Sequence, residues 1–159
     1  DLLGSPDAVR RDLGERMVAD ITAMAKRLKA KTYPYDSRKG VMAIGHLNIV
    51  HGFHTGISAA PQHSRIYGNV VYGHAHSIDC YQTPGLHQKE ARCIGCLCNL
   101  DMEYAARNTG KLRWAHGWAY GWVNNDGTYN INQVRGVNDS GAHAVRFQIV
   151  RSQPIATVS

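Results

Sequence analysis

Two short apolar segments of this chain each lead into histidine, and this feature most constrains what the chain can build. The string LNIVHG brings an apolar run to His51, and the string VVYGHAH places His74 and His76 after another. Loops at strand ends meet solvent on a rigid scaffold and often carry functional side chains. Neutral imidazole is a good ligand for zinc, iron or manganese. Because residues two apart in an extended segment point the same way, we expect His74 and His76 to face one small volume, each toward a different ion of a pair.

Periodicity predicts one long helix followed by a mostly β region. Ser5-Pro6-Asp7 is a typical helix start with Ser5 as the N-cap, and apolar residues follow at spacings of three and four for about 24 residues, to near Lys31. Gly45-His46 predicts a two-residue turn with glycine first, and Asp126-Gly127 predicts a hairpin turn. A short helix interrupted near Pro61 is predicted at 57–67, with Gly68 as its end. The predicted strands are 41–44, 47–51, 70–72, 91–97, 118–123, 128–134 and 143–150.

Length and charge limit the domain organisation and the partners. The 159 residues suit one domain, or part of a larger one, with a helix and linker at 1–38, a β-rich region at 39–150 and a loose tail at 151–159. The net charge of +6 favours anionic partners such as phosphate esters or nucleic acid. The sequence contains no apolar run of membrane-spanning length and no signal peptide, so we expect a cytoplasmic protein with no membrane partner.

Four strings resemble one enzyme family in their order and spacing. LNIVHG, VVYGHAHS, CIGCLCNLDMEYAARN and WAHGWAYGWVNNDGTYNINQVRG resemble the C-terminal portion of calcineurin-like metallophosphoesterases of the phage and prophage type, over roughly residues 40–135. The resemblance implies an α/β (α+β) fold, a two-sheet β-sandwich flanked by helices. It also implies a hydrolase that cleaves phosphate mono- or diesters, possibly DNA or RNA, with a phage-encoded chain acting in the host cytoplasm.

The resemblance also implies a metal centre and the residues that hold it. It implies two divalent ions (Mn, Fe, Zn or Ni), with His51 and His74 on one ion and His76 on the other. In a two-metal site the ions lower the pKa of bound water, orient the phosphoryl group and neutralise developing charge. His54 is the candidate catalytic residue, since it lies near enough to His51 to reach a phosphate or to support a ligand, although an exposed turn position is equally open.

The upstream motifs of that family have no counterpart in the sequence. Asp-x-His and Gly-Asp do not occur, and Gly68-Asn69 is followed by Val70 instead of histidine. Three neutral imidazoles without a carboxylate are too few ligands, with too little charge, for two dications. The sequence therefore suggests the C-terminal half of a larger enzyme that is weak or inactive alone. Its partner would be the N-terminal half or a second copy of the chain.

The cysteines support an alternative function. Cys93, Cys96 and Cys98 lie in the string CIGCLC, with Cys80, His87 and His116 elsewhere as further candidates. A Cys-x-x-Cys pair can begin a zinc site, which would make the chain a non-catalytic, zinc-stabilised nucleic-acid-binding or structural domain. The other interpretation is that these are buried, reduced cysteines in a strand, where Cys96 and Cys98 face one way and Cys93 the other.

Overall fold

The computed structural model describes residues 3–101, 107, 112–138 and 145–146. The chain divides into two compact units, 1–34 and 35–159, so the first boundary falls close to the predicted end of the helix and linker at 38. The predicted tail at 151–159 lies outside the described residues. Neither described helix combines the length and the apolar composition that a membrane crossing requires.

The first unit is built on the helix α1, Ala8–Arg27. It begins after Asp7, whose carboxylate accepts hydrogen bonds from the backbone N–H groups of Val9 (2.8 Å) and Arg10 (3.2 Å). Asp7 therefore caps the helix, in the role that the sequence had given to Ser5. The helix is shorter than predicted because Leu28 caps it and Lys29 takes a left-handed φ of 53°.

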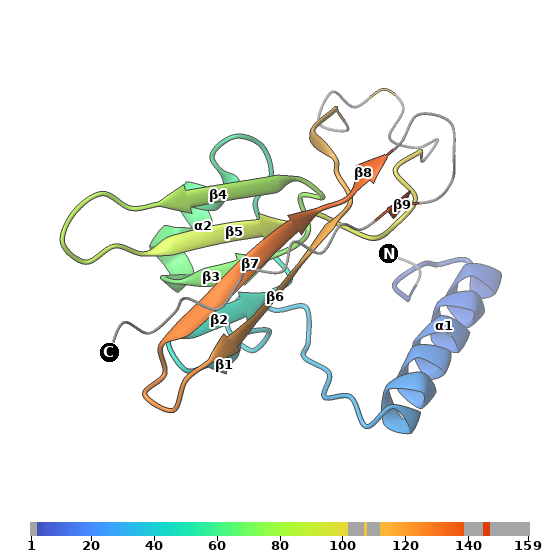
Figure 1. Ribbon diagram of the computed structural model, residues 1–159. Helices are drawn as coiled ribbons and strands as arrows, with labels where there is room; N and C mark the ends of the chain where they lie inside the picture. The colour runs from blue at the N-terminus through green and yellow to red at the C-terminus, as the bar shows by residue number, and fades with distance from the viewer. Residues whose placement is uncertain (1–2, 102–106, 108–111, 139–144, 147–159) are drawn as a thin grey trace. The chain divides into compact units, whose positions relative to one another are not determined.

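A mixed five-stranded sheet forms the centre of the second unit (Figure 1). Its strands, in spatial order, are β1 (Met42–Ile44), β2 (Leu47–Val50), β3 (Val70–Tyr72), β5 (Glu90–Ile94) and β4 (Ile78–Gln82). The three central strands β2, β3 and β5 run parallel, and the two edge strands are antiparallel to their neighbours. Parallel neighbours place the C-terminal ends of β2 and β3 at the same edge of the sheet.

The helix α2, Ala59–Tyr67, connects the parallel strands β2 and β3 and covers one face of the sheet. Its buried residues recur at helical spacing: Ala59, Ala60, His63 and Ser64. The predicted interruption near Pro61 is wrong, because a proline in the first helical turn lacks only an N–H that has no partner there anyway. Gly68, with φ 71°, ends the helix as predicted.

The core lies between α2 and the sheet. It combines the two alanines of α2 with strand residues that alternate toward that face, namely Val50, Val70, Tyr72, Ala91 and Cys93. All of them are at most 5% exposed, and Tyr72 is the largest. Val50 and Tyr72, the last residues of β2 and β3, are thus packed in the core on the α2 side of the sheet.

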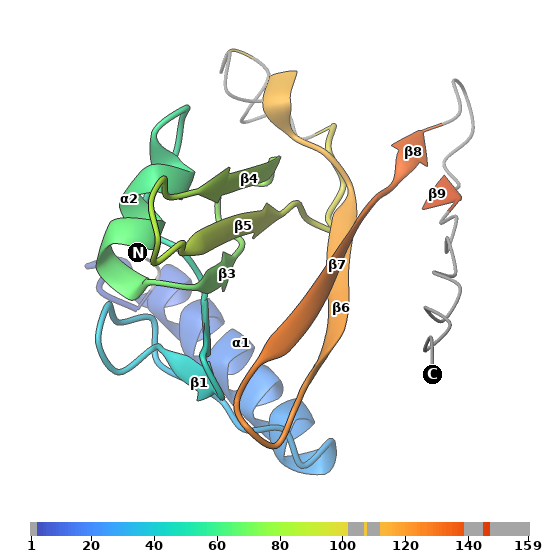
Figure 2. The same cartoon turned by 60° about the vertical axis from the view of Figure 1, so that its left-hand side comes forward.

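A long hairpin covers the opposite face of the sheet (Figure 2). It consists of β6, Gly117–Val123, and β7, Tyr129–Arg135, and confirms the hairpin predicted around Asp126-Gly127. Gln133 Nε2 donates to the carbonyl of Cys93 in the sheet. Gly117 allows close approach, since a Cβ there would lie 2.7 Å from Ile78 Cδ1.

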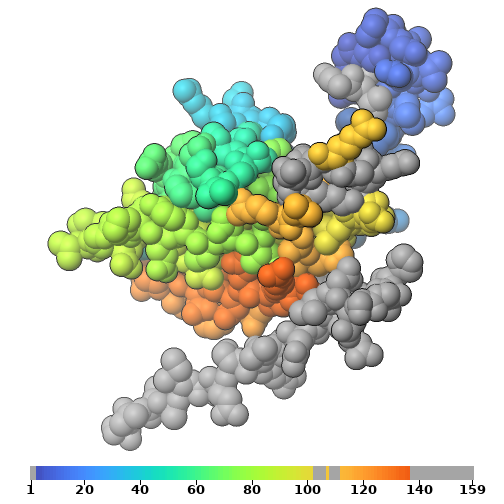
Figure 3. Space-filling model, turned by 90° about the horizontal axis from the view of Figure 1, so that it is seen from above, coloured from blue at the N-terminus to red at the C-terminus, as the bar shows by residue number. Residues whose placement is uncertain are grey.

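The remaining strands are short. β8, Val137–Asn138, pairs with β9, Val145–Arg146, so only two residues of the predicted strand 143–150 fall in a described strand. The β4–β5 connection, residues 83–89, projects beyond the sheet in Figure 3, and Leu86 in it is 99% exposed. The mixed α+β class is thus confirmed, and the two-sheet sandwich stays a prediction.

Replacing Gly45 with alanine is expected to lower the free energy of unfolding by about 2 kcal/mol more than replacing Gly56. Both glycines have positive φ, 56° and 80°, so alanine introduces backbone strain at either position. A Cβ at Gly45 would also lie 2.6 Å from the Gly127 carbonyl oxygen, whereas the space around Gly56 is open. Urea unfolding of both variants measures the difference, and equal losses would contradict the close packing of this turn on the hairpin.

Candidate metal sites at the strand ends

The parallel pairing of β2 and β3 brings His51 and His74 together. Val50 is paired with Tyr72, and just beyond this pair the Gly73 N–H donates to the His51 carbonyl at 2.9 Å. His51 Nε2 lies 3.2 Å from His74 Nδ1. Gly52 beside them has a φ of 105°, which favours glycine, and a Cβ there would lie in tight contact, 3.0 Å from the Cβ of His74. The fold therefore places two of the three predicted metal ligands at one point.

The surroundings of His74 keep its imidazole neutral. Burial lowers the pKa of His74, and the neighbouring His51, His76 and His54 lower it further. The nearest nitrogens of the two rings are 3.2 Å apart, and two charged rings at that distance would repel each other. At least one of the two nitrogens therefore carries no proton and accepts a hydrogen bond from the other. A neutral imidazole is the form that binds a metal ion.

His76 lies in a different environment from the other two histidines. The sequence placed His74 and His76 in an extended segment, and this is wrong: both have left-handed φ values, 60° and 54°, because the chain turns sharply after β3. The ring nitrogen Nδ1 of His76 lies 3.9 Å from Cys98 Sγ, and its ring meets Trp114 edge-on at 4.7 Å. Burial, and to a lesser extent His51, lower the pKa of His76.

His76, Cys96 and Cys98 form a second cluster. Their ligand atoms all lie within 4.8 Å of one another, and the two sulfur atoms are 3.3 Å apart. The strand predicted at 91–97 ends at Ile94, because Gly95 has φ 77° and turns the chain. Cys96 and Cys98 thus follow the strand instead of lying in it. Burial raises the pKa of the Cys96 thiol to about 11, and the neighbouring Cys98 contributes.

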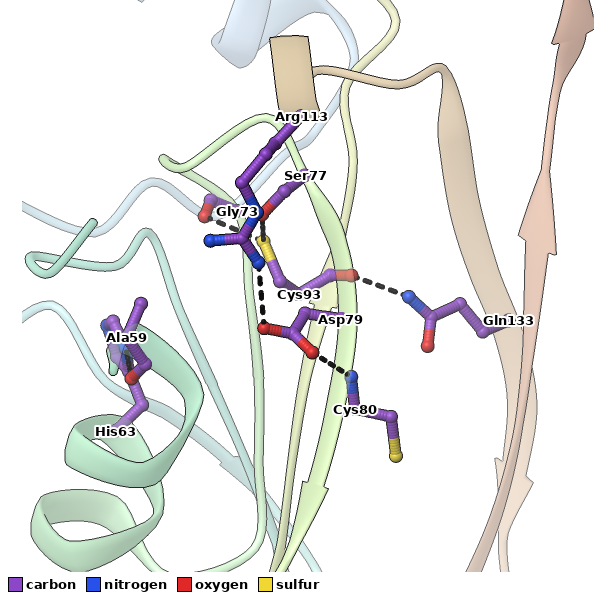
Figure 4. Close-up of polar contacts among 9 residues, drawn as sticks. All are labelled: Ala59, His63, Gly73, Ser77, Asp79, Cys80, Cys93, Arg113 and Gln133. Atoms are coloured by element: carbon purple, nitrogen blue, oxygen red, sulfur yellow. Dashed lines mark hydrogen bonds and ion pairs between the residues drawn. The ribbon is translucent and has the colours of Figure 1, made fainter. Parts of the chain in front are cut away.

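Cys93 does not join this cluster. Its side chain is fully buried in β5, where its thiol donates to the Gly73 carbonyl at 3.5 Å and accepts from Ser77 at 3.7 Å (Figure 4). The alternative that Cys93 acts as a small buried hydrophobic residue fits this position. Cys80 and His87 are exposed, on β4 and in the β4–β5 connection.

His63, which was not predicted from the sequence, supports the loop after β2. Its Nδ1–H donates to the Ala59 carbonyl at 2.8 Å, and its Nε2 accepts from the Phe53 N–H at 3.1 Å. The ring of the candidate catalytic residue His54 meets it edge-on at 5.2 Å. The available signal was the spacing of His63 with Ala59 and Ala60 on the inner face of the predicted helix.

The other histidines occupy supporting positions. His46 is exposed in the β1–β2 turn, and its backbone N–H donates to the Gly127 carbonyl at 2.9 Å. His116 Nε2 donates to the Cys98 carbonyl at 2.9 Å, so it fixes the backbone of the second cluster.

The carboxylates of a dinuclear centre are not supplied by the described residues. Among the described Asp, Glu, His and Cys side chains, no third group joins His51 and His74 within ligand distance. Two imidazoles therefore supply only part of the ligand set of one divalent ion. The assignment of His51, His74 and His76 as ligands stays a prediction. Comparison with family models, curated proteins and solved structures finds no match to the chain.

Proposed function

We propose that this chain supplies imidazole ligands to the centre of a metal-dependent phosphoesterase with the two-sheet sandwich of the metallophosphoesterases. The observation that carries the proposal is the meeting of His51 and His74 at 3.2 Å, at the ends of adjacent parallel strands. These two residues would hold one divalent ion, and His76 would bind a second ion. Bound divalent ions supply Lewis acidity and a water of lowered pKa to phosphate-ester hydrolysis.

In this proposal the chain's own residues bind a metal ion and orient the phosphate ester. His74 holds the ion in the neutral state that burial favours, and His51 would offer the second ring nitrogen, 3.2 Å away. His54 is half-buried and lies close enough to His74 to lower its pKa, and in this proposal it would contact a phosphate oxygen. The net charge of +6 suits a phosphate mono- or diester substrate, including DNA or RNA.

In this proposal the partner must supply the carboxylate ligands of the metal centre. Mn, Fe, Ni or Zn ions in a dinuclear centre need anionic oxygen ligands, and the described residues bring none to His51 and His74. A separate polypeptide segment bearing carboxylates, or a second copy of this chain, would complete the centre. The chain alone is then weak or inactive in a phosphodiester assay with manganese, and robust turnover by the chain alone would contradict the need for a partner.

Manganese is expected to bind at His51 and His74 first. In a titration with Mn²⁺ followed by NMR, paramagnetic broadening should reach the ring signals of these two histidines before those of His46. His51→Ala and His74→Ala should each weaken Mn²⁺ binding at least about tenfold, because each removes one of the two ring ligands. His46→Ala is the matched control, an exposed histidine in the β1–β2 turn. Equal effects of all three variants would overturn the assignment.

A second function is favoured by the thiol cluster. Cys96 and Cys98 lie 3.3 Å apart beside His76, an arrangement suited to a zinc-stabilised, non-catalytic domain that binds nucleic acid or has a structural role. This alternative requires no ion at His51 and His74. The manganese titration therefore separates the two functions, because a thiol-rich site does not favour manganese.

A further inference from the structure

We propose that His76, Cys96 and Cys98 bind one zinc ion, which fastens the turn after β3 to the segment that links β5 to β6. The proposal uses different ligands from the His51–His74 pair, and it assigns His76 to this zinc instead of to a second ion beside that pair. It holds whether or not the chain takes part in phosphate-ester hydrolysis.

The distances are close to those of a tetrahedral zinc site. Zn–S bonds of about 2.3 Å and Zn–N bonds of about 2.0–2.1 Å place two sulfur ligands about 3.8 Å apart and a sulfur and a nitrogen about 3.6 Å apart. The sulfur atoms of Cys96 and Cys98 are 3.3 Å apart, and Cys98 Sγ lies 3.9 Å from His76 Nδ1. Shifts of about 0.3 to 0.5 Å would bring these two distances to the tetrahedral values, and all three ligand atoms lie within 4.8 Å of one another.

The backbone around the three ligands is held by hydrogen bonds between distant segments. The Ala115 N–H donates to the His76 carbonyl at 2.8 Å, and the Cys96 N–H donates to the Ala115 carbonyl at 3.1 Å. The ring of His116 holds the Cys98 carbonyl at 2.9 Å. Each ligand residue therefore has its main chain fixed by the segment around residue 115, so binding requires little ordering of the chain.

The backbone conformation of His76 agrees with its place in this cluster. A left-handed φ of 54° is unfavourable for a residue with a Cβ and persists only where surrounding contacts compensate for it. The conformation brings the ring of His76 to the two thiols. A bond from this ring to a metal ion would supply the compensation, since the ring is needed in this orientation to complete the ligand set.

The ligand types select the ion. Two thiols and one imidazole suit zinc and disfavour magnesium, calcium and manganese, which prefer oxygen ligands. Two thiolates balance the charge of Zn²⁺, so the loaded site adds no net charge to a chain that already carries +6. The fourth position would be taken by water, as in zinc sites with three protein ligands.

The test is metal binding by the whole chain under reducing conditions. We expect about one zinc ion per chain by elemental analysis. Titration of zinc-free protein with Co²⁺ should give the sulfur-to-cobalt charge-transfer absorption of thiolate ligands. Cys96→Ser, Cys98→Ser and His76→Ala should each weaken zinc binding at least about 100-fold. Cys80→Ser, which changes an exposed cysteine outside the cluster, should leave it unchanged.

Two outcomes would overturn the proposal, and neither depends on the variants folding. The first is wild-type protein that binds no stoichiometric zinc. The second is a cobalt spectrum without thiolate absorption, which would place the ion elsewhere. His74→Ala separates this proposal from the phosphoesterase one, because it should keep the zinc and the thiolate absorption while losing manganese binding. Loss of the thiolate absorption in His74→Ala, measured on folded protein, would show that there is no separate thiol site.

Discussion

Replacing Tyr72 with alanine is expected to lower the free energy of unfolding by about 4 kcal/mol, within the usual range for removing a buried aromatic ring. Tyr72 is 1% exposed and is the largest fully buried side chain among the described residues. Its ring stacks on His63 with centroids 3.9 Å apart and an interplanar angle of 13°. The variant leaves a cavity directly beneath the loop that carries His51. Chemical denaturation, followed by fluorescence or circular dichroism, measures the loss.

Tyr72→Phe is the matched control, and we expect a change of less than about 1 kcal/mol. The buried hydroxyl makes no hydrogen bond of ordinary geometry, and the nearby Cys93 thiol is a weak partner. Its removal therefore costs little while the ring remains. A loss in Tyr72→Phe as large as that in Tyr72→Ala would contradict the assignment of the stability to ring packing.

Acidification is expected to destabilise the folded chain through His63. Burial lowers the pKa of His63 below its ordinary value of 6.5; the hydrogen bond to Ala59 opposes this shift, and His54 and His74 add to it. Below about pH 6.5, His63 is protonated in the unfolded chain but stays neutral in the folded chain. The free energy of unfolding therefore falls as the pH drops. The hydrogen bond from the Phe53 N–H also favours neutral His63, because Nε2 of His63 is the acceptor and has no space for a proton of its own.

His63→Gln should reduce the slope of unfolding free energy against pH, below pH 6.5, by up to about 1.4 kcal/mol per pH unit, the value for one proton. His74 and His76, whose pKa values are also lowered by burial, keep part of the slope in the variant. His87→Gln, in the exposed β4–β5 connection, is the control. Urea titrations at several pH values measure the slopes, and equal slopes in wild type and His63→Gln would rule out this role.

Local sequence signals predicted most of the elements of the fold. The apolar strands that became β2 and β3 have glycine or histidine at their ends, and Gly45 and Gly127 mark turns that only residues with positive φ fit well. The edge strand β4, Ile78–Gln82, was missed because its mixture of apolar and polar residues gives no clear period. The strand order could not be predicted, because the insertion of β5 between β3 and β4 depends on long-range pairing.

The candidate site was predicted less completely. His51 and His74 could be expected near each other because both follow apolar strands. The position of His76 could not be, since an assumption of extended backbone fails where the chain adopts left-handed φ values. The pairing of Cys96 and Cys98 with His76 depends on the turn at Gly95, which ends β5 earlier than its apolar pattern indicates.

The cluster of His76, Cys96 and Cys98 has a consequence for how the chain matures. The β6–β7 hairpin pairs neighbouring residues around a tight turn and can form early, because local contacts close quickly. The cluster instead joins His76 to a segment twenty residues later, and both are hydrogen-bonded to Ala115, which lies further along the chain. During synthesis, the thiols of Cys96 and Cys98 therefore emerge from the ribosome before the segment around Ala115 and His116 that contacts these two residues. We expect them to be most vulnerable to oxidation in that interval, so a nascent chain needs a reducing environment more than the finished protein does.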